Sequence, residues 1–411
     1  MVQRREGLPL TPGSLDAQRV TEDVWVTQNS VLGQDAHTSY TGWVVTPEGA
    51  VVIDPGNFRT CHLIREAIAA DGGKTVNYIV YTHAHGDHTI GAPAFIDQKP
   101  KVIAHENAIP RLDRYKLTAD HIRRINSIQF HFPIPPQRFS PVYPTDVYHD
   151  RFEFTLGGVD FKLIHAKGET DDHTLVWLPD MKTVFCGDLL EASFPNLGNP
   201  FKVQRYAHEW ADALETVLAL DPQHAIGGDI VISDKKKLSE VCRDNIALFR
   251  FLEDSVVSAI NAGKNLEQII EGVQLPPGLQ NSPNLKQVYS RREFAIHNVW
   301  KRYCGYFNFS PSGLLPRPRR EIAGVIRALI GDDEAVLQKA RGLLQNGQLQ
   351  LALETLDIIL DADAGNTAAR QLRHEVLQRL AATDTCLMSR NVWVHYLEAD
   401  EEFLRSASTE R

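Results

Sequence analysis

Apolar and polar positions follow two different periods along the chain, and the change of period divides it. Between residues 24 and 186, short runs of β-branched and aromatic residues are separated by turn residues, which predicts strands. Gly157-Gly158 between two such runs predicts a hairpin. Residues 60–70 interrupt the first runs with helical spacing. The predicted strands cover residues 24–27, 40–45, 50–53, 78–81, 152–156, 161–165, 174–178 and 183–186.

Past Glu209 the apolar positions recur at intervals of three and four residues, which predicts helices. The longest such pattern runs from Leu238 to Ala262 and stops at Gly263. Prolines over residues 311–318 are typical of a linker, and a wholly helical tail follows. Its few helices cannot form a stable array alone, so we expect a second subunit or the preceding domain to cover them, and we predict a homodimer. The tail helices are expected over residues 335–345, 350–360 and 367–380.

Composition narrows the class of protein. With 411 residues, of which 43% are hydrophobic, the chain is long enough for more than one folded domain. A formal net charge of -9 argues against a nucleic-acid partner, because phosphate binding needs clustered Lys and Arg. The first residues contain no apolar run that could form a signal peptide or membrane span, so we expect a cytoplasmic protein without a membrane partner. Five scattered cysteines suit a reducing compartment, and we interpret them, Cys186 included, as packing residues.

A cluster of potential metal ligands follows the predicted strand that ends at Tyr81. His83, His85, Asp87 and His88 fall within six residues, and the glycine among them permits the sharp turn that would let them converge. A lone histidine is more often an ordinary core or surface residue, but four potential ligands in this spacing indicate a metal site. Imidazoles with a carboxylate suit zinc, and also iron or manganese.

This HxHxDH motif resembles the metallo-β-lactamase superfamily. The resemblance implies that His83 and His85 serve one metal, while Asp87 and His88 serve a second. It also implies an α+β fold, the αββα metallo-β-lactamase sandwich, here followed by a C-terminal all-helical dimerisation domain. The expected cofactors are therefore two divalent metal ions, with zinc as the first choice.

Two carboxylates match further positions of that family. Asp54, at the end of an apolar strand, matches the aspartate that supports the ligand loop without binding metal, and Asp188 matches the carboxylate that bridges both metals. Where the family has the histidine of a PGH motif, this chain has Glu169, and a glutamate there resembles the alkyl sulfatase branch. The order Gly-Glu-Thr differs from that branch's Gly-Thr-Glu. We favour Glu169 as the ligand, with His173 either orienting a ligand or taking its place.

The last ligand of the family is usually a histidine in a Gly-His or Gly-Gly-His turn. Here Asp229 follows two glycines and stands in that place, and His224 is the alternative. With Asp229, the second site would combine Asp87, His88 and Asp188 with one more oxygen ligand, which keeps iron and manganese open beside zinc.

The likeness to alkyl sulfatases runs from about residue 20 to about residue 405. Residues 275–277, 284–289 and 303–307 are similar to the stretch that follows the catalytic domain in that branch, and the helical tail is similar to its dimerisation domain. The resemblance implies a lactamase-fold domain over 1–255, a connecting segment over 256–325 and a dimerisation domain over 326–411, without the branch's lipid-binding sterol-carrier-like domain.

The resemblance also suggests the substrate. Asn196 and Arg205 are similar to residues that hold the sulfate group, although an arginine beside a helix starting near Glu209 could equally be a surface charge. Two metals with Asp87 and Asp188 would bridge a water and lower its pKa, giving hydroxide for attack on a small organic sulfate ester. The alternatives are a hydrolase of a lactone, lactam or thioester, and a non-catalytic metal-binding assembly protein.

Overall fold

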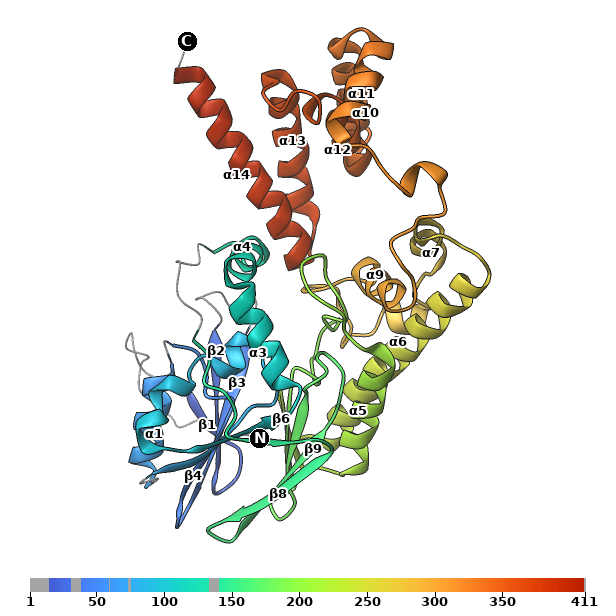
Figure 1. The fold of residues 1–411 in the computed structure, drawn as a ribbon. Coiled ribbons are helices and arrows are strands. Elements are labelled where there is room, and N and C mark those ends of the chain that lie inside the picture. Colours follow the sequence, from blue (N-terminus) through green and yellow to red (C-terminus); the bar gives the residue numbers. More distant parts are fainter. Residues whose placement is uncertain (1–14, 31–37, 59, 73–74, 133–139, 410–411) are drawn as a thin grey trace. The chain divides into compact units, whose positions relative to one another are not determined.

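The chain folds into two compact units (Figure 1), of which the computed structural model describes residues 15–30, 38–58, 60–72, 75–132 and 140–409. The first unit takes residues 1–122 and 136–303, and the second takes residues 123–135 and 304–411. The functional division expected at residues 255 and 325 stays a prediction.

The first unit contains two sheets. In one, β1 to β7 lie side by side in chain order. Neighbouring strands are antiparallel from β1 to β4 and parallel from β4 to β7. The parallel strands therefore bring their carboxyl ends to one edge, where open α/β sheets place their sites. The strands are β1 (Ala17–Arg19), β2 (Val24–Ser30), β3 (Thr38–Thr46), β4 (Gly49–Ile53), β5 (Val76–Val80), β6 (Lys101–His105) and β7 (Asp146–Tyr148).

The second sheet has the order β13-β12-β11-β10-β9-β8. Within it β11 and β12 are parallel and the other pairs antiparallel. The β8–β9 hairpin turns at Gly157 and Gly158, as predicted, and both glycines have positive φ (56° and 86°), which favours glycine. The strands are β8 (Arg151–Leu156), β9 (Val159–His165), β10 (Thr174–Leu178), β11 (Thr183–Gly187), β12 (His224–Gly227) and β13 (Val231–Ile232).

Alternating side chains of the first sheet build two cores. Val51 and Val80 pack with Phe161 of the second sheet, in the core between the sheets. Val52 and Ile79, one residue along, point to the other face and pack against helices α1 (Cys61–Ala70) and α3 (Ala108–Leu117). Helices α5 (Ala207–Ala219) and α6 (Lys235–Asn261) lie beside the second sheet (Figure 1). The expected αββα sandwich is thus confirmed.

The longest described helix, α6, was predicted from its apolar pattern, but its first turn was not. Helix α6 begins before the predicted Leu238, because Asp234 accepts the N–H groups of Lys236 and Lys237 and caps a first turn of lysines. The remaining helices of the first unit are α2 (Gly86–Thr89), α7 (Leu266–Gly272), α8 (Pro277–Gln280) and α9 (Arg292–Tyr303), and α4 (Ala119–Gln129) spans the two units.

The second unit is helical, as expected, but it buries more of its own apolar surface than the sequence suggested. Helices α11, α12 and α13 share a core that includes Leu337, Leu356 and Val376. Helix α10 instead keeps Ile322, Val325 and Leu329 exposed. No helix in the described part of the chain is long and apolar enough to cross a membrane. The helices are α10 (Arg319–Ile330), α11 (Asp333–Gln345), α12 (Leu349–Leu360), α13 (Thr367–Thr383) and α14 (Leu387–Thr409).

Candidate metal centre

His83 and His85 lie on the loop between β5 and helix α2, and Asp87 and His88 lie within α2 itself. Asp54, directly after β4, fixes this segment. Asp54 accepts the Thr82 N–H on Oδ1 at 2.7 Å, and its Oδ2 accepts the Thr82 hydroxyl at 2.6 Å and His88 Nδ1–H at 2.7 Å. Its own backbone is left-handed, with φ 56°. Because the Thr82 hydroxyl donates to Asp54, its oxygen accepts from His83 Nδ1–H at 3.1 Å. Since Nδ1 carries the proton in His83 and in His88, the Nε2 atom of each ring keeps a lone pair that can bind a metal ion.

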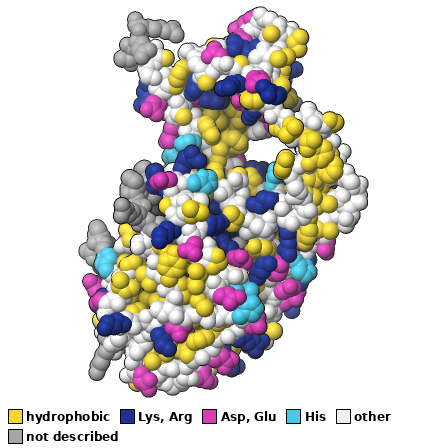
Figure 2. Space-filling model, in the orientation of Figure 1, with side chains coloured by type: hydrophobic (Ala, Val, Ile, Leu, Met, Phe, Trp, Pro, Cys, Tyr) yellow, Lys and Arg dark blue, Asp and Glu magenta, His cyan; other side chains and the backbone are white. Residues whose placement is uncertain are grey.

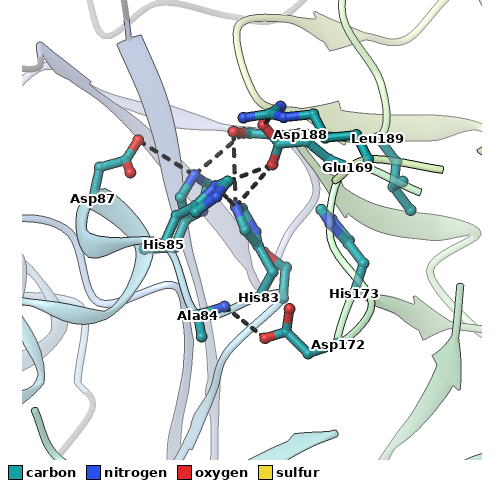
Figure 3. A network of polar contacts seen from close by, with 12 residues as sticks. His83, Ala84, His85, Asp87, Glu169, Asp172, His173, Asp188 and Leu189 are labelled. Carbon is teal, nitrogen blue, oxygen red and sulfur yellow. Dashed lines mark hydrogen bonds and ion pairs between the residues drawn. The ribbon is translucent and has the colours of Figure 1, made fainter. Parts of the chain in front are cut away.

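Four side chains from three loops converge on one point (Figure 3). His83 Nε2 lies 2.8 Å from His85 Nδ1, and Glu169 Oε2 lies 3.2 Å and 3.1 Å from these two atoms. Asp188 Oδ2 completes the set at 3.8 Å from His83 Nε2. We call His83, His85, Glu169 and Asp188 the first donor group; their ligand atoms all lie within 4.8 Å of one another.

A second donor group consists of Asp87, His88 and Asp188. His88 Nε2 lies 3.2 Å from Asp188 Oδ1 and 3.5 Å from Asp87 Oδ2. Asp188 therefore offers one oxygen to each group, since its other oxygen faces His83. Figure 3 shows Asp87 and Asp188 on opposite sides of the histidines.

The spacing and the unsatisfied atoms both fit metal ions. Four ligands around a tetrahedral cation, with bonds of about 2.0–2.2 Å, lie roughly 3.3–3.6 Å apart. The observed distances of 2.8–3.8 Å surround that value. Glu169 Oε2 and His88 Nε2 are buried and have no hydrogen-bond partner among the described residues, although each faces the other donor atoms of its group. Buried polar atoms without a partner are costly, and a cation in each group would satisfy them.

The charges around the two groups affect their histidines in opposite ways. Burial lowers the pKa of His83, and the imidazoles of His88, His173 and His85 lower it further. Burial alone would also lower the pKa of His88, but Asp188, Asp54 and Asp87 outweigh it and raise that pKa well above its usual value. A divalent cation would replace this proton as the partner of the carboxylates.

The structure brings Glu169, and not His173, into the donor set. His173 lies behind His83, with ring centroids 4.4 Å apart and planes at 13°, and its Nε2 donates to Cys186 O at 3.0 Å. Burial lowers the pKa of His173 to about 3. Arg205 Nη1 contacts Glu169 Oε1, and together with His85 it holds the pKa of Glu169 well below its usual range, against the opposing effect of burial. This arrangement leaves Glu169 Oε2 for the centre.

Asp229 and His224 lie at opposite ends of strand β12. His224 pairs with Thr183 at the start of β11, and at about 3.3 Å per residue it lies some 13 Å from the strand end that carries Asp188. Its Nδ1 contacts Ser233 Oγ at 2.8 Å, so the structure does not bring His224 to the cluster. Asp229 follows the correct end but belongs to neither donor group, and it accepts the Ala192 N–H at 3.2 Å. Its role as a ligand stays a prediction.

Two family models match separate parts of the chain. The family model described as "Metallo-beta-lactamase superfamily" matches residues 35–225, and that described as "Alkyl sulfatase dimerisation" matches residues 265–403. The chain joins a metallo-beta-lactamase domain to an alkyl sulfatase dimerisation domain. The resemblance found in the sequence is thus confirmed.

Relatives of the two joined domains cover most of the chain. A linear primary-alkylsulfatase of a Pseudomonas species is 24% identical over 85% of this chain and 71% of its own length. The alkyl/aryl-sulfatase of Saccharomyces cerevisiae is 21% identical over 78% of this chain, which spans only 54% of that protein. A stereoselective inverting sec-alkylsulfatase of a Pseudomonas species has the same fold, with a TM-score of 0.84 and 20% identity over 94% of this chain and 66% of that one.

Arg205 and Asn196, the residues expected to hold the anion, are both buried. Arg205 is buried and contacts Glu169, so the alternative that it is a surface charge is wrong. The preceding loop folds back under the α9 residue Asn298, whose amide accepts Arg205 N–H and donates to Arg205 O. Asn196 is also buried and accepts from Asn199 at 3.3 Å. These contacts are all within the protein, so the binding of a sulfate group by Arg205 and Asn196 stays a prediction.

Sequence reasoning missed three residues near the metal centre of this domain. Burial and Arg205 lower the pKa of Lys202 to about 7, although the negative charges of Asp87 and Glu169 act in the opposite direction. Burial, then Asp229 and Asp188, raise the pKa of Glu191 well above its usual value. Burial likewise raises the pKa of Tyr289, which interacts electrostatically with Arg205. They carry no motif, because only the tertiary fold brings them to the site.

Proposed function

We propose that the chain is a dinuclear metal-dependent hydrolase of small alkyl sulfate esters. The observation that carries the proposal is the pair of donor groups sharing Asp188, in a chain whose long relatives are named alkylsulfatases. Two imidazoles and two carboxylates in the first donor group suit zinc. The second group is richer in oxygen, so iron or manganese remains the alternative for that position.

Bound cations would supply a Lewis acid and lower the pKa of a water molecule, so no serine or cysteine nucleophile is required. The side chains of this chain would hold the two cations and orient the ligands. His83, His85 and Glu169 hold one position and Asp87 and His88 the other, while Asp188 serves both. Asp54 orients His88 and Thr82, as its three short hydrogen bonds indicate, and His173 packs behind His83.

Cationic side chains beside the donor groups favour an anionic substrate. Lys202 and Arg205 interact electrostatically with each other, and Lys202 also interacts with Arg114. Arg205 has one nitrogen on Glu169, so it holds the ligand and contributes positive charge at the same time. We propose that Lys202 and Arg205, with Asn196, bind the sulfate oxygens, because ionic hydrogen bonds to an anion are roughly twice as strong as neutral ones.

A substrate panel tests the proposal. Protein loaded with zinc, and separately with manganese, is assayed on a medium-chain alkyl sulfate, the matching alkyl phosphate, a thioester and a lactone. We expect turnover of the alkyl sulfate that a chelator abolishes and added metal restores. Turnover of the thioester or lactone without any alkyl sulfate activity would replace the proposal with a carbonyl hydrolase. Two bound metals without turnover of any ester would favour a metal-binding assembly protein.

We further propose that the chain acts as a homodimer in a reducing compartment such as the cytoplasm. The dimer is supported by the match over residues 265–403 and by the exposed apolar residues of α10. The compartment is supported by the five cysteines, all of which are described and all of which are free thiols.

A further inference from the structure

The two loops that supply the first donor group are joined by a buried carboxylate that no motif singles out. Asp172 lies three residues after Glu169, and its side chain is fully buried. Its Oδ2 accepts the N–H of Ala84 at 2.8 Å, and Ala84 stands between the ligands His83 and His85 (Figure 3). One hydrogen bond thus fixes the backbone of the histidine loop relative to the loop that carries Glu169.

A second charge holds this carboxylate in place. Arg111 on helix α3 is 8% exposed, and its Nε lies 3.1 Å from Asp172 Oδ1. Its guanidinium also contacts Asp171 Oδ1, with Nε donating at 3.2 Å. Asp172 would otherwise be a buried, unpaired negative charge near Glu169, which is costly. The positive charge of Arg111 therefore stabilises the buried carboxylate of Asp172. The same contact connects the Glu169 loop to helix α3.

The backbone of the same loop is fixed independently. Asp171 O accepts from Asn107 Nδ2 and from His165 Nε2, both at 3.0 Å. These contacts hold the loop even when a side-chain charge is changed. A variant at position 172 should therefore disturb the connection to Ala84 without releasing the whole loop.

Resting on the proposed metal centre, we infer that Asp172, held by Arg111, is the positioning residue of the first donor group, as Asp54 is of the second. Asp54 reaches His88 directly, whereas Asp172 reaches His83 and His85 through the backbone of Ala84. Asp54 also reaches His83 through the Thr82 hydroxyl, whereas the contacts of Asp172 lead to the first donor group alone, although Asp188 is common to both groups. Residues that orient metal ligands typically change metal affinity about 10- to 100-fold when replaced.

The experiment measures stepwise metal binding by the full chain. Metal-free protein is titrated with Co²⁺, whose absorption reports ligand geometry, and with Zn²⁺ against a competing chelator. We expect Asp172→Ala to weaken one of the two binding steps about 10- to 100-fold and to leave the other within about threefold. Asp172→Asn keeps an oxygen for the Ala84 N–H, so it should recover much of the lost affinity.

The matched control is Asp171→Asn, because Asp171 touches the same arginine through its side chain but does not reach the histidine loop. It should bind both metals with affinities close to those of the unaltered protein. Arg111→Gln should weaken the same step as Asp172→Ala, and the double variant Arg111→Gln/Asp172→Asn should be less impaired than Arg111→Gln alone, because neither charge is left unpaired.

Asp172→Ala protein that binds both metals normally, or that loses both steps equally, would overturn the inference. So would equal losses in Asp172→Ala and Asp171→Asn. If Asp172→Ala does not fold, as judged by circular dichroism, the comparison of Asp172→Asn and Arg111→Gln decides in the same way. The readout does not use sulfate ester hydrolysis. A chain that binds two metals but hydrolyses no sulfate ester would therefore refute the proposed function and leave this test intact.

Discussion

Lys202 shows how a single residue can make substrate binding depend on pH. Burial and the neighbouring Arg205 lower its pKa to about 7, so it is cationic below that pH and loses its charge above it. The KM for an alkyl sulfate should therefore rise as pH increases through about 7. Lys202→Met should raise KM about tenfold at pH 6, since a hydrogen bond to a charged group contributes roughly 1.5–3 kcal/mol.

The control for this prediction is Lys202→Arg, because arginine keeps its charge to high pH. It should give a KM that stays low and nearly constant from pH 6 to pH 9. Steady-state kinetics across this range check both variants. A Lys202→Met profile that follows the unaltered enzyme would show that the ammonium group does not contact the substrate.

Gly228 tests the position of Asp188. A Cβ at residue 228 would lie 2.4 Å from Asp188 Oδ1, so Gly228→Ala must displace the carboxylate that both donor groups share. We expect kcat/KM to fall at least about tenfold, with a loss of about 1–3 kcal/mol in the free energy of unfolding from overpacking. Gly342→Ala on α11 meets no atom within 4 Å and should leave activity unchanged. Equal activity of the two variants would contradict the placement of Asp188.

Most of the donor groups could be predicted at this scale because the ligands follow strand ends in short motifs. His83, His85, Asp87 and His88 fall within six residues of one turn that leads into helix α2, so their convergence depends only on local structure. The contact of Arg205 with Glu169 could not be predicted, because it depends on a loop folding back under Asn298, 93 residues away. Asp172 and Lys202 were missed for the same reason.

At the scale of elements, helices α5 and α9 are joined by a carboxylate with a depressed pKa. Glu209 on α5 accepts from Arg302 on α9 at 2.6 Å and 2.8 Å and lies 3.1 Å from Lys167. Burial alone would raise the pKa of Glu209, but these hydrogen bonds outweigh it and lower the pKa to about 2. A depressed carboxyl pKa stabilises the fold above the unfolded value, near 4.5, and this stability is lost as pH falls toward 2.

Glu209→Gln should therefore lower the free energy of unfolding by about 1–3 kcal/mol at pH 7, within the limit of about 1.4 kcal/mol per pKa unit. The difference from the unaltered protein should shrink between pH 4.5 and pH 2. Urea unfolding at several pH values measures it. Glu215→Gln, on the exposed side of the same helix, should change stability by less than about 0.5 kcal/mol. A Glu209→Gln deficit that is constant with pH would contradict this account.

Strands β2 to β5 and β8 to β11 could be predicted because their apolar periods are uninterrupted, as could helix α6, whereas strands β1, β6, β7, β12 and β13 were not predicted. Residues 50–53 and 174–178 are buried along their whole length, and each was predicted from a continuous apolar run. Helices α3, α4, α9, α10 and α14 were not predicted. In α9 and α14, polar residues interrupt the apolar pattern, and tertiary packing decides which side chains are buried.

For the whole molecule, the apolar surface around α10 is where a second copy would bind in the proposed homodimer. Tyr306, Leu315, Val325 and Leu329 are 85%, 82%, 59% and 81% exposed. In Figure 2, hydrophobic side chains gather on the part of the visible face where the segment before α10 lies. Apolar patches of this kind mark interaction sites, and residues 265–403 match a dimerisation family.

The double variant Val325→Asp/Leu329→Asp should therefore sediment as a monomer, because two charges would be buried in the interface. Leu117→Asp, which alters an equally exposed leucine on α3, should remain a dimer. Analytical ultracentrifugation distinguishes them. If the α10 variant sediments like the unaltered protein, the dimer is formed by another surface.

If two cations share Asp188, the number of metal ions bound per chain must show it. Zinc-loaded protein is desalted, and the metal per chain is measured by plasma mass spectrometry for the unaltered protein and for Asp188→Ala. We predict about two zinc ions per chain in the first. The variant should hold fewer than one, because both donor groups lose a ligand. One ion or none in the unaltered protein, or two retained by Asp188→Ala, would mean that Asp188 does not join two metal positions.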